Sequence, residues 1–265
     1  MFKKISNILL KIISIVGIIT LLAFVGQEQE NTICKNLDIE VTNSNDYQFV
    51  DEDEVLKTFN EQNIRIIGAK IKDLDIPKIE LILNTHPHIK NAEVFSEING
   101  DVKIRILQRK PVVRIINVYD ESFYIDEDGL LMPLSLNHSP RLLIANGLIF
   151  EKYNTFYKID FSDSLSYSNV FKNSLLDDLF QIASYVDRDS LWQKQIQQIY
   201  VDKEIQLIPR IGNQQIILGE ATNLENKFNK LRIFYTEAMP KIGWNTYSTI
   251  NLKYSNQVVC TKALK

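Results

Sequence analysis

Apolar and charged residues alternate along Leu37–Val41, a pattern typical of a half-buried β-strand. The period then changes to that of a helix, because Val55 and Phe59 are spaced to share one face. Asp51 precedes this face and stands three residues before Glu54, which is the spacing of a helix-capping pair. The pattern therefore predicts a strand followed by a capped amphipathic helix.

A second helix is predicted directly after the first. Asp75 is placed to cap it, Pro77 falls in its first turn, and Pro87 is expected to end it. Its apolar face is predicted to consist of Ile76, Ile79, Ile82 and Leu83.

Two strands follow this helix. Ala92 and Val94 alternate with polar residues, and so do the apolar residues of the segment 102–106. Asn99-Gly100 lies between them and predicts a tight hairpin turn in which both residues adopt positive φ. The order over residues 37–108 is therefore strand, helix, helix, strand, strand.

The second half of the chain reads as mostly β. Arg109-Lys110-Pro111 suits a junction between domains, because proline lacks an N–H and disfavours helix before it. We expect residues 150–173 to form an irregular insertion and Met239-Pro240 to end the last helix. The predicted elements are strands Val112–Val118, Ser122–Ile125, Leu130–Pro133 and Leu142–Ala145, a helix Ser174–Val186, strands Ile196–Val201, Ile205–Pro209 and Gln214–Gly219, a helix Asn223–Ala238, and strands Tyr247–Tyr254 and Gln257–Lys262.

Only one long apolar run occurs, at residues 5–26. About 20 apolar residues suffice to cross a bilayer core. Lys3, Lys4 and Lys11 lie toward its start and Glu28 follows it, so the positive-inside rule places the N-terminus in the cytoplasm. A cleaved signal peptide is the alternative, although Ala23-Phe24-Val25-Gly26 is a poor cleavage site.

The chain is therefore expected to belong to the α+β class, with one transmembrane helix and two exported domains. The first domain is predicted to have the order β-α-α-β-β, and the second to be a mixed α/β domain with a largely antiparallel sheet. The predicted segments are a cytoplasmic tail 1–4, a transmembrane helix 5–26, a linker 27–35, the first domain 36–109, the second domain 110–262 and a tail 263–265.

Composition limits the function. The formal net charge is −3, and three of the lysines precede or begin the apolar run, so the exported part is more acidic still. Such a surface does not favour binding to nucleic acid. Cys34 and Cys260 could pair in an oxidising compartment, or both could remain free thiols.

Candidate chemistry is sparse. His86 and His88 could share a metal ion, but zinc sites need three or four ligands and the chain has only three histidines. A polar helix end followed by an exposed turn is the alternative for this pair. Asp126-Glu127-Asp128-Gly129 resembles part of a calcium loop, but the glutamate expected at the twelfth position is replaced by Asn137, which favours a hairpin turn.

Motifs for nucleophilic catalysis or phosphate binding are absent from the sequence. There is no Gly-x-Ser-x-Gly, and nine glycines in 265 residues offer little for a phosphate-binding loop. We therefore expect a protein without catalytic activity, cofactor or metal.

Taken together, several segments resemble the bacterial FtsQ/DivIB family of cell-division proteins, whose first exported module is a POTRA domain. Departures from the family pattern occur at His88, Gln108, Asn251 and Lys253. The segments that carry the resemblance are His86–Val94, Ile104–Val112, Phe123–Leu130, Gln215–Gly219 and Ile250–Tyr254.

The resemblance implies a scaffold of the division complex. It implies FtsB- and FtsL-like partners and, through them, the septal peptidoglycan synthases. The protein would be a single-pass type II protein of the inner membrane at the septum, with its domains in the periplasm. The partner would add a strand to the C-terminal sheet edge, and Tyr254 would be an aromatic anchor. The partner-binding residues implied by position are Lys253, Tyr254, Asn256, Gln257, Val258, Val259 and Cys260.

Alternatives remain open at this point. Tyr254 could simply pack inward as a core residue, because Ile250, Leu252 and Tyr254 alternate. The segment Ile89–Val94 is a second candidate surface, for upstream partners. The whole chain could instead be a POTRA-containing chaperone or secretion adaptor, or a metal-dependent envelope hydrolase that uses the histidines.

Overall fold

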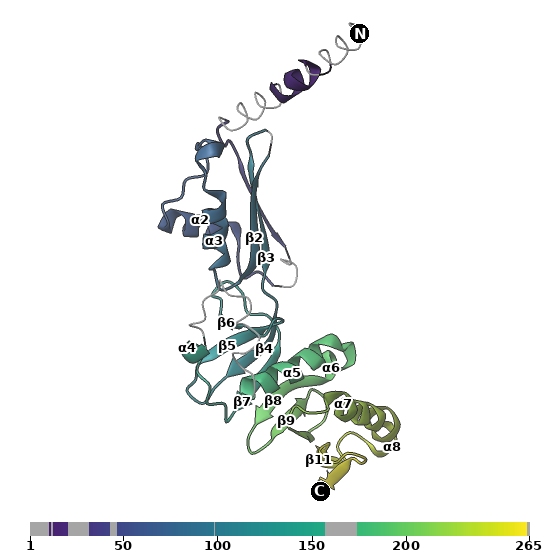
Figure 1. Cartoon of the computed structure of the whole chain (residues 1–265). Coiled ribbons are helices and arrows are strands. Elements are labelled where there is room, and N and C mark those ends of the chain that lie inside the picture. Colours follow the sequence, from purple (N-terminus) through teal and green to yellow (C-terminus); the bar gives the residue numbers. More distant parts are fainter. Residues whose placement is uncertain are drawn as a thin grey trace. The chain divides into compact units, whose positions relative to one another are not determined.

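The computed structural model describes residues 11, 13–20, 32–42, 47–97, 99–156 and 174–263. The chain divides into two compact units, Met1–Gln108 and Arg109–Lys265, each with its own β-sheet (Figure 1). Of the predicted membrane segment 5–26, residues 11 and 13–20 are helical and the others lie outside the described residues. No helix of the described part is long and apolar enough to span a bilayer.

The first unit has a three-stranded sheet with two helices packed on it. The strand order is β1-β3-β2, in which β3 pairs parallel with β1 and antiparallel with β2. This matches the predicted β-α-α-β-β order. The elements are β1 (Leu37–Thr42), α2 (Glu52–Glu61), the 3₁₀ turn η1 (Ile71–Asp73), α3 (Ile76–Asn84), β2 (Ile89–Ser96) and β3 (Val102–Gln108).

Side-chain caps start both helices where the sequence predicted them. An Asp51 carboxylate oxygen accepts from the Glu54 N–H at 2.9 Å, and Asp75 accepts from the Lys78 N–H at 3.1 Å. Each bond satisfies an N–H that has no partner within the helix. Val55 and Phe59 are buried, and in α3 Ile79 and Leu83 are buried whereas Ile76 and Ile82 are only half-buried.

The β2–β3 connection differs from the predicted two-residue turn. The Glu97 N–H donates to the Asp101 carbonyl, so residues 97–101 form a longer loop. Only Gly100 has a positive φ, of 92°, whereas Asn99 does not. The Asn99 side chain instead accepts from the Asp101 N–H at 2.9 Å, because an asparagine can stabilise a turn through its side chain as well as through its backbone.

His88 does not lie in an exposed turn, which corrects the sequence interpretation. The residue is 6% exposed, and its ring stacks on Phe49 with centroids 5.2 Å apart. The His86 Nδ1 atom accepts from the His88 N–H at 3.3 Å, and the His86 Nε2 atom lies 3.4 Å from Glu54 Oε1. Burial lowers the pKa of His86. These histidines are packing residues that join the end of α3 to α2.

Gln108 closes the first unit with a buried amide. Its Oε1 accepts from the N–H groups of Phe49 and Val50 at 2.8 and 2.9 Å. Its Nε2 donates to the carbonyls of Thr42 and Tyr47, each at 3.3 Å. One side chain at the end of β3 thus satisfies four backbone groups, one in the last residue of β1 and three in the segment between β1 and α2.

The second unit is built on a nine-stranded sheet of order β12-β11-β10-β9-β8-β7-β4-β5-β6. Most neighbouring pairs are antiparallel, and the parallel ones are β4–β7, β7–β8 and β10–β11. The elements are β4 (Pro111–Ile116), β5 (Ser122–Asp126), β6 (Leu131–Pro133), β7 (Leu143–Gly147), α4 (Tyr153–Phe156), α5 (Leu175–Arg188), α6 (Ser190–Gln195), β8 (Ile196–Val201), β9 (Ile205–Pro209), β10 (Gln215–Gly219), α7 (Leu224–Ile233), the π-helical turn η3 (Phe234–Ala238), α8 (Met239–Ile242), β11 (Tyr247–Asn251) and β12 (Val259–Lys262).

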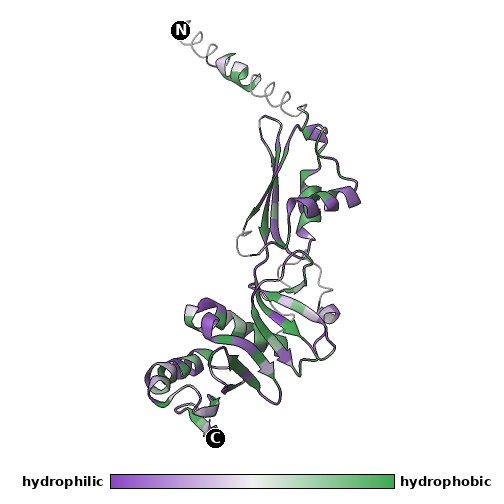
Figure 2. Ribbon diagram, turned by 180° about the vertical axis from the view of Figure 1, so that it is seen from behind, coloured by the Kyte–Doolittle hydropathy of each residue, from purple (hydrophilic) through white to green (hydrophobic). Residues whose placement is uncertain are grey.

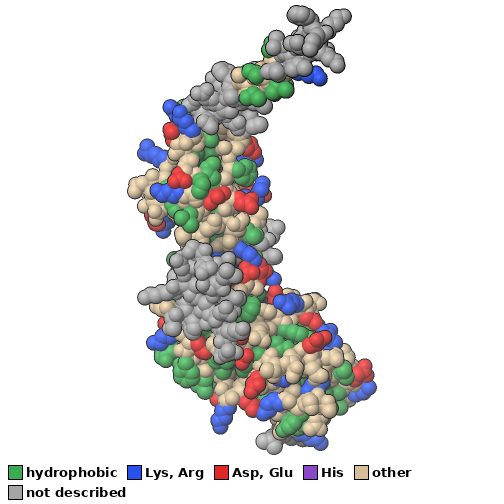
Figure 3. Space-filling model, in the orientation of Figure 1, with side chains coloured by type: hydrophobic (Ala, Val, Ile, Leu, Met, Phe, Trp, Pro, Cys, Tyr) green, Lys and Arg blue, Asp and Glu red, His purple; other side chains and the backbone are tan. Residues whose placement is uncertain are grey.

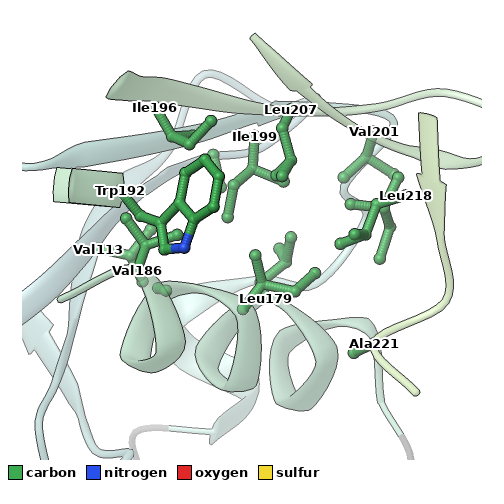
Figure 4. Packing of buried hydrophobic residues seen from close by; sticks show 14 of the residues in the cluster. Val113, Leu179, Val186, Trp192, Ile196, Ile199, Val201, Leu207, Leu218 and Ala221 are labelled. Atoms are coloured by element: carbon green, nitrogen blue, oxygen red, sulfur yellow. The ribbon is translucent and has the colours of Figure 1, made fainter. Parts of the chain in front are cut away.

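Helices cover one face of this sheet and form the core with it. Hydrophobic residues are concentrated on the strands and on one side of the helices (Figure 2). Leu179 and Val186 of α5 and Trp192 of α6 point at β8 and β9, where Ile199 and Leu207 are fully buried (Figure 4). Alternation along the strands turns every second residue into this core.

Two parts of the helical layer were not predicted. The helix α6, which places Trp192 in the core, is only six residues long, too short for a periodic signal. The last helix does not end at Met239-Pro240. It passes through a π-helical turn and continues as α8, ending at Gly243 with φ 88°. Pro240 lies directly after the π-helical turn, where the regular i→i−4 ladder that a proline would interrupt is already broken.

A buried ion pair marks the start of the second unit. Arg109 Nη1 lies 2.9 Å from Asp126 Oδ2, and the two side chains are 8% and 1% exposed. Asp126 Oδ1 accepts from the N–H groups of Asp128 and Leu130, and Gly129 has φ 82°. The hairpin turn expected in place of a calcium loop is confirmed. Burial raises the Asp126 pKa, and the Leu130 N–H and Arg109 oppose that rise.

Residues 157–173 of the predicted insertion lie outside the described residues. Its beginning is described, and Tyr153–Phe156 forms the single turn α4. The Phe123 and Tyr153 rings lie 5.6 Å apart, so this turn packs against the sheet.

A candidate partner-binding sheet edge

The strand β12 forms one edge of the nine-stranded sheet. It pairs antiparallel with β11 on one side, and no described strand lies on its other side. The opposite edge is β6, which has three residues and ends in Pro133, a residue without an N–H. Among these two edges, β12 offers more backbone for a further strand.

The register shows which backbone groups of β12 face outward. The Leu252 N–H donates to the Ile217 carbonyl of β10 at 2.9 Å, so alternate residues of β11 face β10 and β12. Asn251 pairs with Val259, whose backbone groups therefore face β11. Alternation directs the N–H and C=O groups of Cys260 and Lys262 away from the sheet. Among the described residues, Ser248 Oγ donates to the Lys262 carbonyl at 3.5 Å, whereas no such bond reaches the Lys262 N–H or the outward groups of Cys260.

The side chains of β12 and of the turn before it fall into two groups. Val258 and Cys260 pack against the hydrophobic core, which anchors the edge strand. Val259 is 41% exposed on the other face, and Asn256 and Gln257 are exposed in the turn. An added strand would thus meet an ordered backbone with one exposed aliphatic side chain.

Lys253 and Tyr254 do not lie in a strand, because β11 ends at Asn251. Tyr254 is 48% exposed, so the alternative in which it packs inward is wrong. Lys253 forms an ion pair with Glu204 of the β8–β9 turn, and its pKa is raised by this hydrogen bond. The predicted site residues are consecutive or nearly so, and the structure keeps them together at one end of the sheet.

A hollow of about 870 Å³ adjoins this end of the sheet. Its walls come from the β8–β9 turn, the end of β10, the first turns of α7, and the segment after β11 that includes Lys253, Ser255 and Asn256. Lysines and carboxylates both line it, and charges of both signs are interspersed over the visible face of the unit (Figure 3). Buried Lys227 donates to the Glu220 carbonyl at 2.7 Å, and desolvation lowers its pKa.

The sheet of the first unit has two edge strands, β1 and β2, and side chains of helix α3 cover the β2 edge. Glu80 accepts from the Val94 N–H at 2.8 Å, and Asn84 accepts from the Ala92 N–H at 2.9 Å. These two N–H groups would otherwise be available to an added strand. Side chains that cover an edge are a known protection against unwanted pairing. The segment Ile89–Val94, the second candidate surface, therefore has its edge donors occupied.

The described residues contain no cluster of three or more metal-ligating side chains. Cys34 and Cys260 are both free thiols. Cys34 is 1% exposed and donates to the Asn36 carbonyl at 3.3 Å. Burial raises the pKa of both thiols, which reduces their reactivity.

Sequence reasoning missed the residues that cover the β2 edge. Glu80 and Asn84 looked like polar residues on the exposed side of a helix, and nothing in their spacing signalled a contact with a strand. Lys230 of α7, whose ammonium group binds backbone carbonyls after β11, was missed for the same reason. Only the placement of these helices beside a strand end reveals the contacts.

Comparison with known proteins agrees with this architecture. The model of the FtsQ/DivIB C-terminal related family matches residues 110–261, and that of the POTRA-like domain matches residues 32–107. A search of curated proteins finds no match. The first match spans more than half of the chain and the nine-stranded sheet except for Lys262, the last residue of β12. The resemblance seen in the sequence is thus confirmed, and the chain belongs to the FtsQ/DivIB C-terminal related family, with a POTRA-like domain before the part that defines it.

Proposed function

We propose that this protein is a non-catalytic scaffold of the bacterial division machinery that captures an FtsB/FtsL-like complex by strand addition at β12. The observation that carries this proposal is the open edge, where the backbone groups of Cys260 and Lys262 face outward. Backbone bonding supplies affinity in such complexes, and neighbouring side chains supply selectivity. Through these partners the protein would be linked to the septal peptidoglycan synthases.

The contrast between the two sheets supports the choice of β12. On the β2 edge of the first unit, N–H groups are bonded to Glu80 and Asn84, whereas no described side chain accepts from the outward N–H groups of Cys260 and Lys262 on β12. Exposed Tyr254 and Val259 lie beside the open edge and offer apolar contact area. The match over residues 110–261 favours this role over a POTRA-containing chaperone or secretion adaptor.

We further propose that the protein is a single-pass type II protein of the inner membrane, with its two units in the periplasm at the division septum. The support is the apolar run 5–26 with lysines toward its start and acidic residues after it. Fusion of a periplasm-inactive reporter to either end of the chain tests the orientation. Reporter activity at the C-terminus would refute it.

Proline at position 260 tests the strand addition. Cys260→Pro removes an outward N–H but no donor of the β11–β12 ladder, and proline is tolerated on an edge strand in this orientation. We expect the full chain to bind a synthetic peptide from its FtsB-like protein about two- to tenfold more weakly, as for one lost hydrogen bond. Calorimetry measures the affinity.

Two matched variants separate this effect from damage to the fold. Cys260→Ser changes the side chain and keeps the N–H, so it should bind like the unaltered chain. Val259→Pro removes a donor that faces Asn251 and should instead loosen β12 itself, lowering stability as well as affinity. Unchanged affinity in Cys260→Pro would show that the partner does not use this edge.

A further inference from the structure

The segment after β11 leads to the proposed edge but lies outside the sheet. Residues 252–258 connect β11 to β12, and they carry the exposed Tyr254. Strand ladders no longer hold the carbonyls of this segment, so other groups must bind them if the segment is to keep one conformation. Besides the bond from the Leu252 N–H to the Ile217 carbonyl, the structure shows two attachments of this segment, and the first of them binds its carbonyls.

The first attachment comes from helix α7. Lys230 Nζ donates to the Leu252 carbonyl at 3.0 Å and also to the Tyr254 carbonyl. An ammonium group has three N–H donors, so one lysine can bind both oxygens. The two carbonyls flank Lys253, and their common partner fixes the backbone direction at the point where the Tyr254 side chain leaves it.

The second attachment comes from the β8–β9 turn. Lys253 forms an ion pair with Glu204, and its N–H donates to Asn251 Oδ1 at 3.0 Å. A Cβ atom at Gly219 would lie 3.0 Å from the Lys253 Cγ, so the aliphatic part of this lysine passes close over the glycine. The ion pair is partly exposed and is worth little by itself. The bonds from Lys230 therefore contribute more than this ion pair to the order of residues 252–254.

Burial supports a backbone-binding role for Lys230. The residue is only partly exposed, and desolvation lowers its pKa. No carboxylate is bonded to it among the described residues, so the two carbonyls are the groups that compensate its partial desolvation.

We propose that Lys230 is a positioning residue for partner capture: it holds residues 252–254 in the conformation that presents Tyr254 and β12 to the partner, without itself forming part of the open edge. This inference rests on the proposed function. A binding surface that is ordered before association avoids the entropy of ordering at the moment of binding. Loss of the ammonium group should therefore weaken binding even though no edge group is altered.

The test compares two substitutions in the full chain. Lys230→Met keeps the aliphatic stem but removes the donors, whereas Lys230→Arg keeps donors and charge. Lys241→Met is the control, because it removes an exposed lysine of α8 that has only an i,i+4 ion pair with Glu237. Amide hydrogen exchange of residues 252–258, read by mass spectrometry, reports order in the segment without any partner.

We expect faster exchange in residues 252–258 of Lys230→Met, and about tenfold weaker binding of the FtsB-like peptide, as for a lost charge-assisted contact. Lys230→Arg should recover most of both, and Lys241→Met should change neither. Unchanged exchange in Lys230→Met would overturn the inference. Faster exchange with unchanged affinity would also overturn it, while leaving the proposed edge in place.

Failure of the proposed function has a different outcome. If the unaltered chain does not bind the peptide, or if Cys260→Pro binds as well as the unaltered chain, the edge proposal is wrong. The exchange comparison would still show whether Lys230 orders the segment. The two proposals are thus tested separately.

Discussion

The buried amide of Gln108 offers the sharpest test of how the first unit is held together. The residue is 1% exposed and bonds four backbone groups from the end of β1 to the start of α2. Gln108→Ala would leave the N–H groups of Phe49 and Val50 without this acceptor. A buried donor left unsatisfied costs about 1–3 kcal/mol. With the lost packing, we expect the unfolding free energy of this unit to fall by about 3–5 kcal/mol.

Gln108→Glu gives a pH-dependent version of the same test. The carboxylate still accepts from Phe49 and Val50, but its second oxygen faces the carbonyls of Thr42 and Tyr47, to which the amide donates. Ionisation is disfavoured there, so the folded-state pKa of the new carboxyl should exceed its unfolded value. The destabilisation is then present at neutral pH and disappears as pH falls through that raised pKa.

The assay can separate the two units. Both tryptophans, Trp192 and Trp244, belong to the second unit, so the change of their fluorescence in urea reports that unit. Hydrogen exchange of the peptides around residues 49–59 and 102–108 reports the first. A loss below about 1 kcal/mol in Gln108→Ala, or equal behaviour of Gln108→Glu at pH 4 and pH 7, would refute the reasoning.

Two further predictions concern ionisable groups. The pKa of His86 is lowered in the folded state, so its contribution to the stability of the first unit should be full above pH 6.5 and should decline as pH falls from there toward the folded-state pKa. His86→Gln should flatten this decline, which urea titrations at a series of pH values measure. Arg109→Met should leave the buried Asp126 carboxylate without its cation and lower the stability of the second unit by about 3–5 kcal/mol, while Arg109→Met with Asp126→Asn should recover part of that loss. Tryptophan fluorescence in urea measures the second effect, and additive losses in the double variant would contradict it.

Local pattern was sufficient for most elements. Periods of two and of 3.6 residues identified strands and helices, and the Asp51 and Asp75 caps set the starts of α2 and α3. Pattern failed where the geometry of neighbours overrode it. Pro240 reads as a helix end, yet it begins α8, and His88 reads as exposed, yet it stacks on Phe49.

The candidate site likewise has features that the sequence predicted and features that only the structure revealed. Its location at residues 253–260 was inferred from the sequence, because those residues are contiguous and match a family pattern. The β2 edge is covered by Glu80 and Asn84, which reach N–H groups 14 and 8 residues further along the chain. The order beside the edge depends on Lys230, which binds carbonyls 22 and 24 residues away.

The sequence by itself determined the α+β class and the two-unit order, since both follow from periodicity, capping and turn residues that act over a few positions. The family was identified from the resemblance of several segments, taken in order. The tertiary structure alone decided which backbone groups of β12 face outward and which side chains hold or cover the strand ends. These properties depend on register and on helix placement. Both arise from packing between distant segments, and a hydrogen bond between such segments leaves no periodic trace in the sequence.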